Sequence, residues 1–283
     1  MQRILFPTDF SENAWNAVAF ALSLFKNEEC EFFIMNVFQL GSSGLVTTMN
    51  RANETRLYKI TKEESKKGLQ SVLKRIEENY DNPKHKFNTL IRVSTLTNAI
   101  RQVVFDKDID YIIMGTKGAT GLKEVFMGSN AYKTIKNINL CPIIAVPDDF
   151  EQNVIETILF ITGFEHIYHT YEIKPMVDIA KILSAKIRVL YLGDLNSLEP
   201  HQKTAYELIQ KRLKIVEHEI VILKKEKPIN VMIKELVEEN NDIGVVCMIN
   251  YWHSFLEKIT HEPVIKKVAF NTKVPFLVMH LYD

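Results

Sequence analysis

Cysteine is scarce in this chain, and net charge and long apolar runs are missing. The 283 residues contain three cysteines, Cys30, Cys141 and Cys247, which stand singly, so neither a paired metal motif nor a disulfide framework is expected. The 35 lysines and arginines balance the 35 aspartates and glutamates, which leaves no overall field to attract nucleic acid or an anionic membrane. No apolar run approaches the roughly 18 residues that cross a bilayer, and no leader pattern opens the sequence. We therefore expect reduced thiols and a soluble, cytoplasmic protein without nucleic-acid or membrane partners.

The sequence contains an internal repeat. Residues 4–10 read ILFPTDF and residues 158–164 read ILFITGF, with five of the seven positions identical. Strand-like and helix-like segments follow both copies in the same alternating order, which favours parallel, doubly wound sheets. The sequence therefore predicts an α/β protein of two tandem doubly wound domains, residues 1–147 and 154–283, each with a five-stranded parallel sheet. The polar joint between them, residues 147–153, is short enough to predict that the domains pack together.

The expected elements follow hydrophobic periodicity and helix-capping signals. In the first copy, Ser11 is placed to cap a helix, and the segment 55–80 reads as a long amphipathic helix. Its predicted inner face consists of Leu57, Ile60, Leu69, Val72, Leu73 and Ile76. The other expected strands are 32–37, 87–93, 110–115 and 142–146, and the other helices are 96–106 and 130–137. In the second copy we expect strands at 158–162, 187–192, 219–223, 244–249 and 275–280, and helices at 175–183, 201–216, 229–238 and 263–270.

A glycine-rich loop carries the main chemical signal. Gly115 and Gly118 follow the fourth expected strand, and Gly128 and Ser129 precede a helix. Glycines let phosphate oxygens approach backbone amides, and a helix start offers unpaired N–H groups and the positive end of its dipole. The loop is neither the G-x-x-x-x-G-K-[ST] motif nor the dinucleotide G-x-G-x-x-G motif. The alternative is that these glycines are only turn residues.

Two motifs resemble the ATP-binding branch of the universal stress protein family. The spacing Gly115-x2-Gly118-x9-Gly128-Ser129 is similar to its phosphate loop, and residues 7–11, PTDFS, are similar to its first strand-to-helix turn. The resemblance implies an adenine nucleotide alpha hydrolase-like, Rossmann-like fold that binds ATP or AMP, with Mg²⁺ or Mn²⁺ on the phosphates. It also implies site roles: Asp9 contacts adenosine, Pro7, Thr8 and Val37 line the adenine pocket, Met114 and Gly115 lie near the ribose, and Gly118, Gly128, Ser129 and Asn130 bind phosphates.

The second copy lacks the phosphate loop. When Cys141-Pro142 is aligned with Val274-Pro275, the positions of Gly115, Gly118, Gly128 and Ser129 are occupied by Met248, Tyr251, His261 and Glu262. Gly163 replaces Asp9 in the repeated segment. We therefore expect one nucleotide per chain, bound by the first domain. A metal site at His166 and His169 is a less favoured reading, and no metal ligand is assigned.

The leading hypothesis is a cytoplasmic, nucleotide-dependent regulator of the stress response, a context that the family resemblance supplies. A slow ATP hydrolase or phosphotransferase is an alternative, although no catalytic residue can be assigned, because no base is spaced to activate water beside Ser129. A nucleotide-free stress scaffold is a third possibility. By analogy with dimers in the family, residues 143–146 are expected to pair with residues 276–279, and whole chains to associate as a homodimer.

Overall fold

The computed structural model describes residues 1–39, 48–117, 128–148, 150, 155–250 and 273–281. The strands of the first half are β1 (Gln2–Pro7), β2 (Cys30–Phe38), β3 (His85–Val93), β4 (Tyr111–Gly115) and β5 (Ile143–Val146). Its helices are α1 (Glu12–Leu24), α2 (Thr48–Asn79), α3 (Leu96–Lys107) and α4 (Ser129–Asn137). The strands of the second half are β6 (Thr157–Ile161), β7 (Lys186–Leu192), β8 (His218–Leu223), β9 (Ile243–Asn250) and β10 (Phe276–His280). Its helices are α5 (Thr170–Leu183), the short 3₁₀ helix η1 (Leu195–Ser197), α6 (Pro200–Leu213) and α7 (Ile229–Glu239). The helix expected at residues 263–270 lies outside the described residues.

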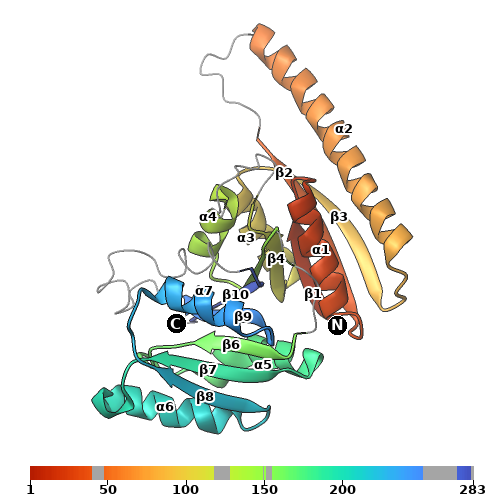
Figure 1. Cartoon of the computed structure of the whole chain (residues 1–283). Helices are drawn as coiled ribbons and strands as arrows, with labels where there is room; N and C mark the ends of the chain where they lie inside the picture. Colours follow the sequence, from red (N-terminus) through yellow and green to blue (C-terminus); the bar gives the residue numbers. More distant parts are fainter. Residues whose placement is uncertain (40–47, 118–127, 149, 151–154, 251–272, 282–283) are drawn as a thin grey trace.

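The ten strands within the described residues form one sheet in the order β3-β2-β1-β4-β5-β10-β9-β6-β7-β8 (Figure 1). Within each half every neighbouring pair is parallel. At the centre, β5 and β10 pair antiparallel, with Leu277 opposite Ile144. The protein is thus a mixed α/β fold with a large, mostly parallel sheet, built from two five-stranded arrays of mirrored strand order. Among the described residues, no helix has the length and apolar character needed to span a membrane.

Helices cover both faces of the sheet, as expected for doubly wound chains. Alternate strand residues face opposite sides, so Ile4 and Phe6 belong to one core and Leu5 to the other. The first core is covered by α1, α2, α5 and α6, and the second by α3, α4 and α7. Each core contains residues from both halves, because the central β5–β10 pair makes the two faces continuous.

Two helices differ from the expectation. Helix α2 begins at Thr48, and Leu57 and Ile60, which were predicted to face the core, are 50% and 46% exposed. The reason is visible in Figure 1, where the N-terminal part of α2 extends past the sheet and has no strand to cover. Helix α5 begins at Thr170, five residues before the predicted start at Pro175. The Glu172 carboxylate accepts a hydrogen bond from the His169 N–H at 2.6 Å and closes a first turn that the proline signal did not reveal.

The repeated segment forms the same turn in both halves. After β1, the Thr8 hydroxyl accepts a hydrogen bond from the Phe10 N–H at 3.0 Å, and after β6 the Thr162 hydroxyl accepts one from Phe164 at 2.9 Å. Both phenylalanines have positive φ angles, 66° and 56°. A left-handed residue at this position costs free energy, and the threonine hydroxyl stabilises the turn. The sequence repeat is therefore also a repeat of backbone conformation.

The position of the β5–β10 pair at the centre of the sheet predicts that shortening a side chain there destabilises the protein more than at the edge. Leu277 is fully buried opposite Ile144, so we expect Leu277→Ala to lower the free energy of unfolding by about 2–5 kcal/mol. Ile222 lies on the outermost strand β8 and is 39% exposed, so Ile222→Ala should lower it by less than about 1 kcal/mol. Chemical denaturation of both variants measures the difference, and equal losses would contradict a central role for the pair.

Candidate functional site

An open cleft of about 730 Å³, including its mouth, lies at the carboxyl ends of β1, β2 and β4 and the start of α4. Nine of the ten residues predicted from the sequence line it, and Gly118 lies outside the described residues. These nine are Pro7, Thr8, Asp9, Val37, Met114, Gly115, Gly128, Ser129 and Asn130. The cleft is also lined by residues that the sequence reasoning did not select: Ala14, Asn36, Leu96, Thr116, Lys117 and Ala131.

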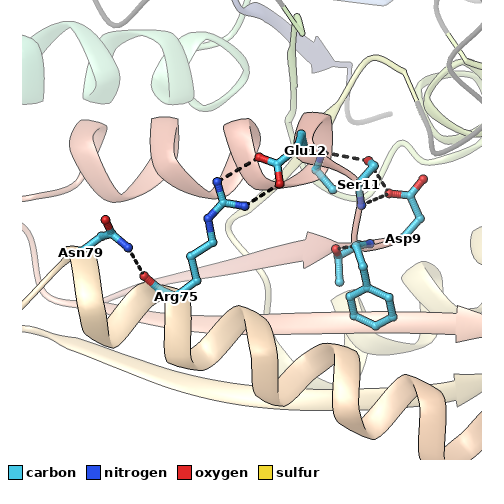
Figure 2. Close-up of polar contacts among 8 residues, drawn as sticks. Asp9, Ser11, Glu12, Arg75 and Asn79 are labelled. Carbon is cyan, nitrogen blue, oxygen red and sulfur yellow. Dashed lines mark hydrogen bonds and ion pairs between the residues drawn. The ribbon is translucent and has the colours of Figure 1, made fainter.

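The turn after β1 positions Asp9 at the cleft. Figure 2 shows the Asp9 carboxylate beside Ser11, whose N–H and hydroxyl both donate to Asp9 Oδ1, at 3.1 and 2.6 Å. The Ser11 oxygen in turn accepts from the Ala14 N–H at 3.2 Å and caps α1, as the sequence predicted. Asp9 is exposed. The capping network therefore orients a carboxylate that remains accessible from solvent.

The same turn is tied to α2 by two contacts. Figure 2 shows Arg75 of α2 making two hydrogen bonds to the Glu12 carboxylate, at 2.8 and 2.9 Å. Its guanidinium also lies 4.1 Å from the Trp15 ring centre. These contacts join α1 to α2 next to Ser11. The long helix is thereby fixed against the turn that carries Asp9.

Hydrogen bonds between buried polar groups connect α2 to β2 and to the turn that borders the cleft. Ser65 of α2, only 2% exposed, donates to Asn36 Oδ1 at 2.8 Å, and Asn36 Nδ2 donates to the Thr8 carbonyl at 2.8 Å. Asn36, in the expected strand 32–37, is not among the site residues predicted from the sequence. The available signal was a lone amide near the end of a buried strand, where a polar group requires a hydrogen-bond partner.

Gly115 makes room for the side chain of Asn13. A Cβ at residue 115 would lie 2.0 Å from Asn13 Oδ1, and that oxygen accepts a hydrogen bond from the Lys117 N–H at 2.9 Å. Gly115 has no positive φ angle, so a glycine is required here for the close approach of Asn13 and not for its backbone conformation. Asn13 is 8% exposed, and its Nδ2 finds no hydrogen-bond partner among the described residues.

The start of α4 offers backbone donors to the cleft. The helix begins at Ser129, and Gly128, which precedes it, supplies no side chain to cap it. The Gly128 N–H donates to the Thr116 carbonyl at 2.6 Å and ties together the two ends of the loop. Ser129 and Asn130 are exposed. Unpaired amides of a first turn, together with the helix dipole, favour an anion at this position.

The second half differs at the matching turn. Gly163 occupies the position of Asp9, and the Thr162 hydroxyl lies 2.6 Å from the hydroxyl of Tyr168, which is buried. Tyr251, His261 and Glu262 lie outside the described residues. No group of three or more His, Cys, Asp or Glu side chains suited to a metal occurs in the described ranges. His166 lies 3.7 Å from the buried Glu172 carboxylate.

Comparison with known proteins places the fold and the sequence among universal stress proteins. Residues 1–147 match the family model described as "Universal stress protein family". Universal stress proteins MJ0531 and MJ0577 of Methanocaldococcus jannaschii are each 30% identical over 145 and 159 residues, and each match covers 51% of this chain and 81% and 94% of the relative. A crystal structure of a universal stress protein from Archaeoglobus fulgidus matches 99% of this chain and 97% of its own, with a TM-score of 0.63 and 14% identity. That last likeness establishes the fold alone.

The contact between Gly115 and Asn13 predicts a steric effect. We expect Gly115→Ala to lower the free energy of unfolding by about 1–3 kcal/mol, because the added carbon must displace Asn13 or β4. Gly163→Ala is the matched control at the end of β6, where the nearest atom to an added Cβ is 3.5 Å away. Urea denaturation of the two variants tests this, and an equal response would show that Asn13 yields without cost.

Proposed function

The chain belongs to the universal stress protein family, and we propose that its first half binds an adenine nucleotide, ATP or AMP, in the cleft described above. One observation carries the proposal. Four separate segments of the sequence bring nine of the predicted residues to one cleft, and an uncapped helix start opens into it. An apolar wall, an exposed carboxylate and unpaired amides are together the chemistry of a nucleotide site.

Each part of the nucleotide has a complementary group. The phosphates would lie at the start of α4, against the amides of the first turn and the hydroxyl of Ser129. The Asp9 carboxylate would accept hydrogen bonds from ribose hydroxyls. Val37 and Met114 would flank the adenosine part, with the backbone of Val37 offered to the base edge. Gly118 is proposed as a further phosphate contact from the loop.

A divalent cation, Mg²⁺ or Mn²⁺, would enter with the phosphates. Within the described residues no three metal-binding side chains gather at the cleft, so those residues alone do not form a complete cation site there. Phosphate oxygens and water supply the ligands that a hard cation prefers. The cation would neutralise part of the phosphate charge, and the backbone amides of α4 would orient the phosphate.

We propose that the two halves act as domains, residues 1–147 and 154–283, with unequal roles. The first binds the nucleotide, and the second, with Gly163 and a buried Tyr168 at the matching turn, serves structure and partner contact. The β5–β10 pair supports a fixed association of the halves in solution. The protein would act in the cytoplasm as a nucleotide-dependent regulator of the stress response, as a homodimer of two-domain chains, without rapid turnover of the nucleotide.

The proposal predicts a melting shift that depends on the first half alone. Ligand at 100 times its dissociation constant stabilises a protein by about 2.7 kcal/mol, which raises the melting temperature by several degrees at roughly 2 °C per kcal/mol. We expect this shift with Mg-ATP for the wild type. Gly128→Val should abolish it, because a branched side chain would occupy phosphate space at the start of α4. Differential scanning calorimetry with and without Mg-ATP measures the shift.

The matched control is Gly163→Val, which adds the same side chain after β6 in the second half, where an added Cβ would come no closer than 3.5 Å to the Glu165 side chain. It should keep the full shift. Titration calorimetry should give one nucleotide per chain. Two sites per chain, or a shift retained in Gly128→Val and lost in Gly163→Val, would refute the assignment to the first half.

A further inference from the structure

Lys117 links the cleft to the joint between the two halves. Its side chain lines the cleft, and its Nζ lies 2.5 Å from Oδ2 of Asp148, the second residue after β5. The Asp148 carbonyl accepts a hydrogen bond from Asn16 Nδ2 of α1 at 3.0 Å. Two residues further on, the ring of Phe150 packs edge-on against Phe20, with ring centres 5.5 Å apart. Residues 148 and 150 of the joint therefore contact α1, and the Asp148 carboxylate forms an ion pair with Lys117 in the cleft.

The backbone and the side chain of Lys117 have different degrees of freedom. The backbone N–H is fixed by the buried Asn13 Oδ1, whereas the side chains of Lys117 and Asp148 are 24% and 39% exposed. Partly exposed ion pairs contribute little net stability and are screened by salt. Lysine is a flexible point charge that can turn toward another anion. A nucleotide phosphate in the same cleft carries more charge than one carboxylate and is a competing partner.

We propose that Lys117 exchanges partners when the nucleotide binds, leaving Asp148 for a phosphate. This inference rests on the proposed nucleotide site and adds two properties to it. Lys117 favours phosphate-bearing ligands over adenosine. Asp148 couples nucleotide binding to the joint, because phosphate binding removes the ion pair that ties residue 148 to the cleft. The sequence alone does not reveal this contact, because Asp148 lies 31 residues from Lys117 in the chain.

A double-mutant cycle tests the exchange. Titration calorimetry would measure the binding of Mg-ATP and of adenosine to the full-length wild type, Lys117→Met, Asp148→Asn and the double variant. Lys117→Met should weaken Mg-ATP binding at least about tenfold, the usual effect of one charge-assisted hydrogen bond, and leave adenosine binding unchanged. Asp148→Asn should tighten Mg-ATP binding, because the lysine is already free. That gain should shrink in the double variant, which has no lysine to release.

The control for removal of a lysine is Lys227→Met, since Lys227 pairs with Glu235 in the second half. It should leave both affinities unchanged. An undiminished gain from Asp148→Asn in the absence of Lys117, or a normal Mg-ATP affinity in Lys117→Met, would overturn the exchange while leaving the proposed site intact. Failure of both ligands to bind the wild type would overturn the site and the exchange together.

Hydrogen–deuterium exchange at the joint supplies a second readout. Saturating Mg-ATP should speed exchange in peptides that cover residues 147–153 of the wild type. Adenosine should not, and Asp148→Asn should exchange rapidly even without ligand. Exchange at the joint that is unaltered by bound Mg-ATP would show that occupancy is not transmitted through Asp148.

Discussion

The antiparallel pairing of β5 with β10 is the constraint on which the rest of the structure depends. Each strand would otherwise be the edge of a five-stranded parallel array, with unpaired backbone groups that invite association. Paired, both strands are buried along their whole length, and the cores on the two faces extend from one half into the other. Two contacts beside the pair cross between the halves, from the Tyr111 hydroxyl to the Pro175 carbonyl and from Asn250 Nδ2 to the Ile135 carbonyl.

The position of the cleft follows from the winding of the first half. From β1 the chain proceeds through α1 and α2 on one face to β2 and β3, then crosses through α3 on the other face to β4. The direction of winding therefore reverses between β1 and β4, the place where open α/β sheets bind ligands. The cleft lies at this place, bordered by the turn after β1, the end of β4 and the start of α4.

The two halves share a framework and differ in what occupies its equivalent turn. Both keep the threonine-to-phenylalanine hydrogen bond and the positive φ angle that follows the first strand. In the first half, Phe10 is 39% exposed and packs its ring against Gly68 of α2, so the turn is supported from the helix side. In the second half, Phe164 is fully buried among Tyr191 and Tyr206. The two turns thus share a backbone conformation, while aromatic packing gives the second turn different surroundings.

The sequence by itself predicted most elements and the repeat, because periodicity and capping are local signals. Its resemblance to a known family implied the nine described residues of the cleft. Only the tertiary structure decided which surface of α2 is buried, since exposure of Leu57 and Ile60 depends on where the sheet ends. It also revealed that Gly115 accommodates Asn13 and that Lys117 meets Asp148. Residues 13 and 115 are far apart in the chain, and their contact arises only when α1 packs beside β4. Local patterns reveal the secondary structure, but distant contacts depend on packing between elements.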